Sequence, residues 1–315
     1  MNKRMCANVD EHNCSGFLTH RDDVQLADNI RNVLHRFFIE DDRSEDVHDL
    51  ELTNRREDVF VSYIEDRINN ANCYDKDLII LSAFKNDEDL ILDIGANWGY
   101  SVADLWSYGA GTRILSFEPV KFYAPLLEKI KEMRPGKYEY KLVALFDEPS
   151  TLKFVVPVVN NLPVFALSTA VNNPNIEFMV KDICFHIKNY MKADDWINVR
   201  MHEFLAPVDT LDNQLKIIKS NFSWKQISAI KIDVEGLEYY VLKGGFDTIV
   251  EYCPLIMIED GNRNKEVTEF LEKINYIFAV RLNEKLVFSD VMDDRVNGFF
   301  VHSSKIEEYK NLGIL

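Results

Sequence analysis

The sequence predicts an α/β fold: a doubly wound, mostly parallel sheet with helices on both faces. Three observations support this prediction. From Asp87 onward, short apolar runs typical of buried strands alternate with helical stretches. A glycine turn, residues 93–99, joins the first such run to the first helix, and an acid, Glu118, ends the second run. Such alternation specifies right-handed crossovers and a ligand site at the carboxyl ends of the strands.

The elements follow one another in a regular order. Apolar stripes predict amphipathic helices over 24–38 and 60–68, separated by an acidic linker, and a further apolar run covers 78–84. The alternating part then predicts strands at 90–95, 113–119 and 138–147, helices at 100–108 and 122–133, and a strand at 151–159 that can form a hairpin with 138–147. Residues 160–207 break this rhythm, which resumes with strands at 227–236 and 254–260, helices at 238–243 and 266–274, and late strands at 276–282 and 298–303. We therefore expect an N-terminal helical extension (1–85) and a sheet domain (86–315) with an insertion at about 155–207.

Composition excludes several classes of protein. The 315 residues contain 36 Lys and Arg against 52 Asp and Glu, a formal charge of −16, which argues against a nucleic-acid partner. No apolar run reaches the ~18 residues that span a bilayer, and the N-terminus lacks a signal-peptide apolar core. The five cysteines are scattered and form no CxxC pair, so we expect reduced thiols and a cytoplasmic location, without a disulfide framework or zinc site.

The turn after the first strand restricts the ligand. Gly95 permits a tight bend, and Gly99 permits close packing of the following helix. A dinucleotide fingerprint has a second bare glycine where this chain has Asn97, whose side chain would crowd a pyrophosphate. Glu118, at the tip of the next strand, can accept hydrogen bonds from both hydroxyls of a ribose. A nucleoside with a compact charged tail, such as S-adenosylmethionine, fits this pattern, although a glycine bend and an acidic strand terminator would leave the same residues.

Five ordered motifs resemble those of FkbM-type methyltransferases between residues 87 and 260. They are DIGANWG (93–99), SFEP (116–119), VDTLD (208–212), KIDVEG (231–236) and PLIMIE (254–259). The resemblance implies the class I methyltransferase fold, a Rossmann-like sheet with an antiparallel C-terminal strand, and S-adenosylmethionine as cofactor. It also implies O-methylation of a hydroxyl on a sugar, glycan or other natural product. The cofactor would then be held by Asp93, Gly95, Asn97, Gly99 and Glu118, and by an adenine-flanking loop from Ala144 to Asp147 in which Phe146 replaces the usual small polar residue.

Candidate catalytic residues lie at the tip of the fourth strand. Asp233 is the first choice as the base or the acceptor-orienting group, because a hydroxyl is a poor nucleophile until its proton has a destination. Glu235 is a second candidate, but a continuing strand would aim it to the opposite face, where it could bond to the amides that begin the next helix. His186 and His202 lie in the insertion, where acceptor recognition is expected, and either could supply the base.

Other acidic residues have simpler interpretations. Asp209 and Asp212 can be helix N-caps. Asp233, Glu259 and Asp260 could in principle bind a metal, but no sequence spacing supports one, so none is expected.

Two other functions are compatible with these residues. An NAD-dependent sugar oxidoreductase would share the sheet and Glu118, but Asn97 argues against it. A catalytically silent cofactor-binding scaffold in a biosynthetic complex would share every cofactor motif. The expected partner of an active enzyme is a small-molecule or glycan acceptor; the sequence does not indicate an oligomeric state.

Overall fold

The computed structural model describes residues 28, 30, 57–70, 73, 75–159, 162–163, 169–170, 180, 184, 199–259, 264–291 and 297–315. The chain divides into two compact units. The main unit contains residues 51–153 and 205–315, and the minor unit contains 1–50 and 154–204. The division into an extension, a sheet domain and an insertion stays a prediction.

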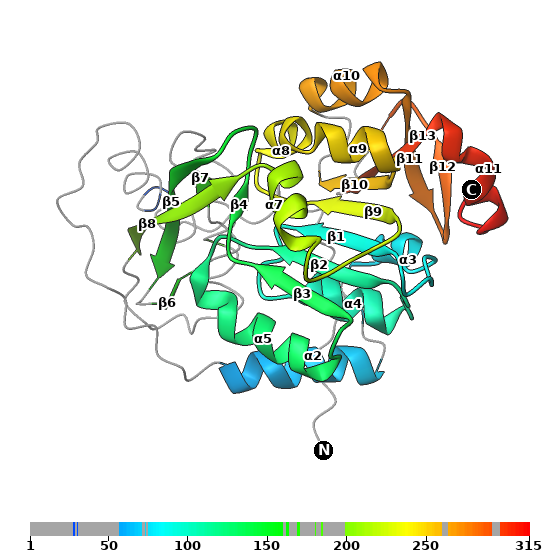
Figure 1. Cartoon of the computed structure of the whole chain (residues 1–315). Coiled ribbons are helices and arrows are strands. Elements are labelled where there is room, and N and C mark those ends of the chain that lie inside the picture. The colour runs from blue at the N-terminus through cyan, green and yellow to red at the C-terminus, as the bar shows by residue number, and fades with distance from the viewer. Residues whose placement is uncertain are drawn as a thin grey trace. The chain divides into compact units, whose positions relative to one another are not determined.

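The main unit is built on an eight-stranded sheet with the order β12-β11-β13-β10-β9-β1-β2-β3 (Figure 1). Five strands are mutually parallel: β1 (Leu90–Ile94), β2 (Arg113–Phe117), β3 (Tyr138–Lys141), β9 (Ile227–Ile232) and β10 (Leu255–Glu259). β13 (Asn297–His302) runs antiparallel between β10 and β11 (Tyr276–Leu282), and β12 (Lys285–Phe288) forms the edge. The chain winds outward from β1 in one direction and from β9 in the other, so the order reverses between these strands. The predicted doubly wound sheet with an antiparallel C-terminal strand is confirmed.

Helices cover both faces of this sheet (Figure 1). On one face lie α2 (Glu57–Asn70), α4 (Tyr100–Ser107) and α5 (Ala124–Met133), which a 3-10 turn, η3 (Lys121–Tyr123), precedes. On the other face lie α7 (Leu211–Ile218), α8 (Glu238–Gly244), α9 (Phe246–Tyr252) and α10 (Lys265–Lys273). Alternate strand residues, including Leu92, Ile230 and Ile256, pack against Leu215, Leu242 and Leu271 of these last helices and form the main apolar core.

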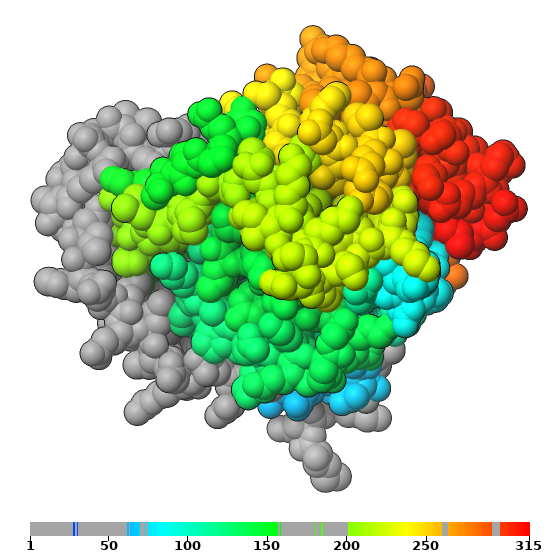
Figure 2. Space-filling view, in the orientation of Figure 1, coloured from blue at the N-terminus to red at the C-terminus, as the bar shows by residue number. Residues whose placement is uncertain are grey.

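The segment before β1 lies against the C-terminal segment. In the space-filling view, atoms of the cyan region that includes α3 (Leu78–Leu81) adjoin the red C-terminal region (Figure 2). Phe84 contacts Tyr309 of α11 (Ile306–Asn311), edge to face, with ring centroids 6.0 Å apart. A 3-10 turn, η6 (Ser303–Lys305), connects β13 to α11. These contacts fix the start of the main unit to its end.

Two strand predictions are wrong. Residues 138–147 form not one strand but β3 and then β4 (Ala144–Leu145), which pairs in parallel with Val208 and Asp209 of β8 (Val199–Asp209). The reason lies in the partner strand. Ile114 donates its N–H to the Lys137 carbonyl and Glu118 to the Lys141 carbonyl, and the next donor in this alternation is Val120. Val120 donates its N–H to the Glu118 carboxylate instead, so the ladder ends there. β5 (Ser150–Val159) forms its hairpin with β6 (Leu162–Pro163), and also pairs with β7 (Thr169–Ala170), not with 138–147.

In the minor unit, the described part of β5 carries buried Val155 and Val158, and Phe154 stacks on Phe204 with ring centroids 5.6 Å apart. Of the helix predicted over 24–38, Asp28 and Ile30 are described, both helical, and the rest lies outside the described residues. The helix predicted at 60–68 is confirmed as α2. Within the described part of the chain, none of the helices has the combined length and apolar character that crossing a bilayer requires.

Candidate active site

The glycine turn between β1 and α4 lies against the end of β9. Gly95 has φ +82°, and a Cβ built on it would lie 1.8 Å from the carbonyl oxygen of Asp233. Gly99 has φ +90°, and a Cβ there would lie 2.2 Å from Cδ1 of Ile130 on α5. Both positions have a left-handed backbone, and at Gly95 the contact is with backbone atoms, which leave no room for a side chain. The turn is therefore fixed directly to the strand tip that carries Asp233.

Glu118 closes the other side of this turn. Its Oε2 accepts from the Asn97 amide at 2.7 Å, and its Oε1 accepts from the Val120 amide at 2.8 Å. The residue is 5% exposed, and burial raises its pKa to about 7 in spite of these two bonds. Each carboxylate oxygen has a further lone pair, so Glu118 can hold the turn and still accept from a ligand. Asn97 has φ +52°, which places it in the left-handed region as well.

A row of polar side chains crosses the sheet beneath the turn. Asp93, Ser116 and Lys231 are register partners on β1, β2 and β9. Asp93 is fully buried and accepts from the hydroxyls of Ser101 (2.9 Å) and Ser116 (2.8 Å). The Nζ of Lys231 lies 3.6 Å from Oδ1 of Asp93. Asp93 thus acts within the sheet as the anion that anchors the start of α4 and the buried lysine.

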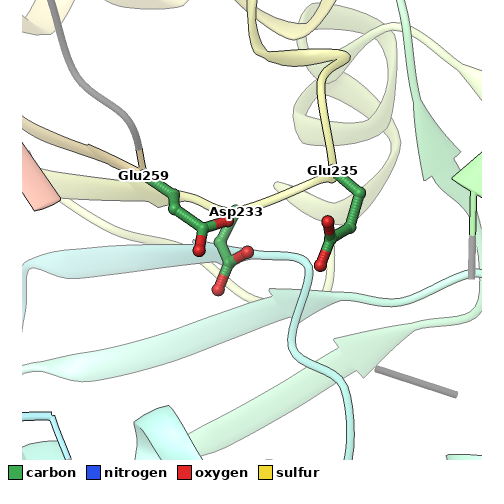
Figure 3. Close-up of side chains that lie close together, drawn as sticks. All are labelled: Asp233, Glu235 and Glu259. Atoms are coloured by element: carbon green, nitrogen blue, oxygen red, sulfur yellow. The ribbon is translucent and has the colours of Figure 1, made fainter. Parts of the chain in front are cut away.

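Three carboxylates converge at the tips of β9 and β10. Oxygens of Asp233, Glu235 and Glu259 all lie within 4.8 Å of one another, and their side chains point to the same side of the strands (Figure 3). The expectation that Glu235 faces away is wrong, because β9 ends at Ile232 and the backbone turns at Glu235 (φ +55°) and Gly236 (φ +93°). The spacing of the three carboxylates would suit a cation as well as a shared proton. The hydrogen bonds that Asp233 receives favour the proton.

Asp233 is held as the charged member of this group. Its Oδ2 accepts from the hydroxyl of Tyr100 and from Nζ of Lys231, each at 3.0 Å. Burial alone would raise the pKa of Asp233, but Lys231 and the bonds from Glu259, Lys231 and Tyr100 outweigh it and hold that pKa below its ordinary value. The Asp233 charge, together with burial, raises the pKa of Glu259 far above its ordinary value. The two shifts have opposite directions and favour a proton on Glu259 over one on Asp233.

The helix caps near the site differ from those expected. Glu238, not Glu235, accepts from the Gly236 amide at the entrance to α8 (3.0 Å). Thr210 caps α7 by accepting from the Asn213 amide. Asp212 reaches the start of a different helix, α9, and accepts from Thr248. The expected N-cap role is wrong for Asp209, which accepts from the side chain of Gln214 at 2.8 Å and from that of Asn213 at 3.1 Å, both within α7.

The remaining candidates are less central. Ala144 is buried in β4, and Asp147 forms an ion pair with Lys243 of α8. Gly244 allows α8 to approach this loop, since a Cβ there would lie 1.9 Å from the Phe146 carbonyl oxygen. His202 is half-buried in the part of β8 that belongs to the minor unit. His186 and Asp260 lie outside the described residues.

Sequence reasoning missed Lys231, Tyr100 and Asp75. Lys231 left a signal, because a lone charge inside the apolar run ISAIKI must be paired when the strand is buried. Tyr100 and Asp75 left none, since both depend on tertiary position. Asp75 precedes α3 and accepts from Asn297 of β13 (3.3 Å), and burial raises its pKa to about 7. Asn297 also donates to Asp77 at 3.1 Å, so the loop before α3 is tied beside the carboxyl end of β10.

One family model matches this chain, and several solved structures are similar to it. The family model described as "Methyltransferase FkbM domain" matches residues 93–281. Among solved structures, the chain resembles the methyltransferase FkbM of Methylobacillus flagellatus, with 14% identity, a TM-score of 0.40, and coverage of 78% of this chain and 59% of that one. An O-methyltransferase of Bacillus cereus in complex with SAH gives 11% identity, a TM-score of 0.35 and coverage of 85% and 99%.

A S-adenosylmethionine-dependent O-methyltransferase of Thermotoga maritima gives 14% identity, a TM-score of 0.35 and coverage of 76% and 70%. No curated protein matches significantly. The structural similarities are weak, and the chain spans about three fifths of the M. flagellatus protein. The assignment rests instead on the family model, which covers more than half of the chain and includes both the glycine turn and the Asp233 cluster. The chain belongs to the FkbM methyltransferase family, and its cofactor is S-adenosylmethionine.

Proposed function

We propose that the chain transfers the methyl group of S-adenosylmethionine to a hydroxyl oxygen on a sugar, a glycan or another natural product. The observation that carries this proposal is the Asp233 carboxylate. It is held ionised by Lys231 and Tyr100 at the strand tip that the cofactor turn touches. A fixed carboxylate at this edge is suited to accept the proton of a hydroxyl.

The residues of the turn fit the cofactor. Glu118 retains lone pairs for the ribose hydroxyls after it accepts from Asn97 and Val120. The carboxylates of Asp233 and Glu235 provide a negative environment for a sulfonium, whereas the same charges would repel a pyrophosphate. Family membership and this charge pattern together argue against the NAD-dependent oxidoreductase.

The bound cofactor supplies an electrophilic methyl group on its sulfonium. The chain's part is to hold the acceptor hydroxyl in line and to receive its proton. Asp233 accepts a hydrogen bond from that hydroxyl, and takes the proton as the oxygen–carbon bond forms and the carbon–sulfur bond breaks. Because its pKa is low, Asp233 orients the hydroxyl throughout and takes the proton only as the oxygen becomes positive.

The charges near Asp233 favour a neutral acceptor. Oxygens of Glu235 and Glu259 lie within 4.8 Å of Asp233, the charge of Asp75 acts on Lys231, and Lys231 is already paired with Asp233 and Asp93. A phosphate or carboxylate on the acceptor would add repulsion at this edge. The formal charge of −16 likewise opposes a nucleic-acid acceptor. We also infer that the methyl transfer takes place in the cytoplasm.

The test is release of S-adenosylhomocysteine with a panel of neutral glycans, polyketides, amines and anionic sugars. We expect turnover with a neutral hydroxyl acceptor, and loss of that turnover in Asp233→Asn. Methylation of amines alone would refute the O-specificity. Tight cofactor binding without turnover on any acceptor would instead support the silent scaffold.

A further inference from the structure

We propose that Lys231 is a positioning residue for methyl transfer: with Tyr100 it fixes Asp233 as the anion of the Asp233–Glu259 pair and leaves the single proton on Glu259. This inference rests on the proposed function, since it specifies which carboxylate faces the acceptor. It gives a part in the reaction to two residues, Lys231 and Glu259, to which the resemblance assigned none.

The geometry makes the two carboxylates unequal. Ile232 and Ile258 are register partners, so Asp233 and Glu259 leave adjacent parallel strands side by side. Asp233 receives two hydrogen bonds of 3.0 Å, from Lys231 below and from Tyr100 at the start of α4. Lys231 also lies 5.7 Å from the centre of the Tyr100 ring, so the two donors lie against each other. A cation favours the ionised form of the carboxylate it touches, and the neighbouring carboxylate then retains the proton.

Lys231 is itself fixed in place. Its side chain is 3% exposed and lies between Asp233 at 3.0 Å and Asp93 at 3.6 Å. Burial lowers the pKa of Lys231, but the two aspartates outweigh it and hold the lysine charged. Asp93 is fixed in turn by Ser101 and Ser116. Lys231 therefore connects the Asp233 carboxylate to Asp93 in the central sheet and holds it in place.

The other charges around Asp233 act in the opposite sense. Glu259 of β10 and Glu235 of the loop after β9 lie within the same 4.8 Å group, and Asp75 acts from the loop before α3. An ionised carboxylate at any of these positions would push a proton onto Asp233. Among the described residues, Lys231 is the cation that touches Asp233, so its removal should leave the proton on the wrong carboxylate. Asp233 would then be unable to take the proton that the acceptor oxygen releases.

The experiment is the pH profile of turnover for wild type, Lys231→Met, Lys231→Arg and Lys225→Met. Lys225 is the matched control, because it pairs with Glu88 on the surface. We expect the acidic limb of the Lys231→Met profile to move up by about one to three pH units, the range for loss of an adjacent opposite charge. Turnover should fall most at mildly acidic pH, where Asp233 would be protonated in the variant and ionised in the wild type. Lys231→Arg should move the limb back toward wild type, and Lys225→Met should not move it. A Lys231→Met limb that coincides with wild type would overturn the proposal.

A second measurement needs neither turnover nor a folded Lys231→Met variant. At about pH 8.5, where the Glu118 and Asp75 carboxyls are ionised, the infrared absorption of a protonated carboxyl should be present in the wild type and absent in Glu259→Gln. A band that survives in Glu259→Gln but disappears in Asp233→Asn would put the proton on Asp233 and overturn the assignment. If magnesium ions abolished the band and increased turnover, a cation rather than a proton would occupy the carboxylate group, and the assignment would be overturned as well. Absence of turnover in the wild type would count against the proposed function alone.

Discussion

Substitution of Gly95 by alanine should damage the fold and the site together. The new Cβ would lie 1.8 Å from the Asp233 carbonyl oxygen and 2.9 Å from its carbonyl carbon. An ordinary contact begins near 3.4 Å, so the strand tip must move by roughly 1.6 Å, and backbone cannot yield as a flexible side chain can. The left-handed backbone adds ~1–2 kcal/mol for alanine, and the overpacking ~1–3 kcal/mol. We expect the free energy of unfolding to fall by about 2–5 kcal/mol.

Alanine variants of two other glycines separate the contribution of backbone strain from that of overpacking. Gly136 has φ +76° with no atom within 4 Å of the added Cβ, so Gly136→Ala reports the backbone strain alone. Gly99→Ala meets the end of the Ile130 side chain, which can move, and should lie between the two. The measurement is urea unfolding of the three variants, with S-adenosylmethionine affinity determined for each that folds. If Gly95→Ala costs no more than Gly136→Ala, the contact between the turn and the Asp233 carbonyl is not what requires glycine.

Three further outcomes follow from the site. Glu118→Gln should weaken S-adenosylmethionine binding by about 10- to 100-fold. Because burial raises the pKa of Glu118 to about 7, the affinity of the wild type should fall from pH 8 to pH 6, and that of the variant should not. If calorimetry gave both proteins the same pH dependence, the role of Glu118 would be limited to ending its strand. Asp233→Asn should keep cofactor affinity within a few-fold and cut turnover by ~10²–10⁴-fold, and a loss of cofactor binding would reassign Asp233 to the cofactor. Arg67→Met should lower the free energy of unfolding by ~3–5 kcal/mol, because Asp104, 3.1 Å away, would stay buried without its cation. The control is Lys129→Met, at an exposed pair with Glu132, which should leave the free energy of unfolding unchanged. Equal losses in the two variants would contradict the prediction.

The sheet was predictable because its strands are continuous apolar runs punctuated by turns. The short, continuous apolar runs at β1, β2, β9 and β10 are typical of buried parallel strands, and their alternation with helices determines the doubly wound order of the sheet. β12 and α9 were missed. β12 is a four-residue edge strand with one buried residue, Leu286, so its sequence carries no clear alternation. The break between β3 and β4 follows from the neighbouring strand, where the Val120 N–H bonds to the Glu118 side chain, and no local pattern in 138–147 contains this.

The site was predictable where a backbone constraint selects the residue. Gly95 and Gly99 occupy left-handed positions that another atom closely approaches, and such positions leave glycine in the sequence. Glu235 was misplaced because its direction depends on where β9 stops, and a one-residue change reverses the face. Tyr100 and Asp75 meet Asp233 and Lys231 only through folding. Their parts in the charge balance therefore required the structure.

The central claim is that the turn at Gly95–Gly99 and the acid Glu118 hold S-adenosylmethionine beside Asp233. The most direct measurement is a calorimetric titration of the whole chain with S-adenosylmethionine, S-adenosylhomocysteine and NAD. We predict saturable binding of both sulfur nucleosides, weakened in Glu118→Gln, and no binding of NAD. Binding of NAD with no response to either sulfur nucleoside would contradict the account.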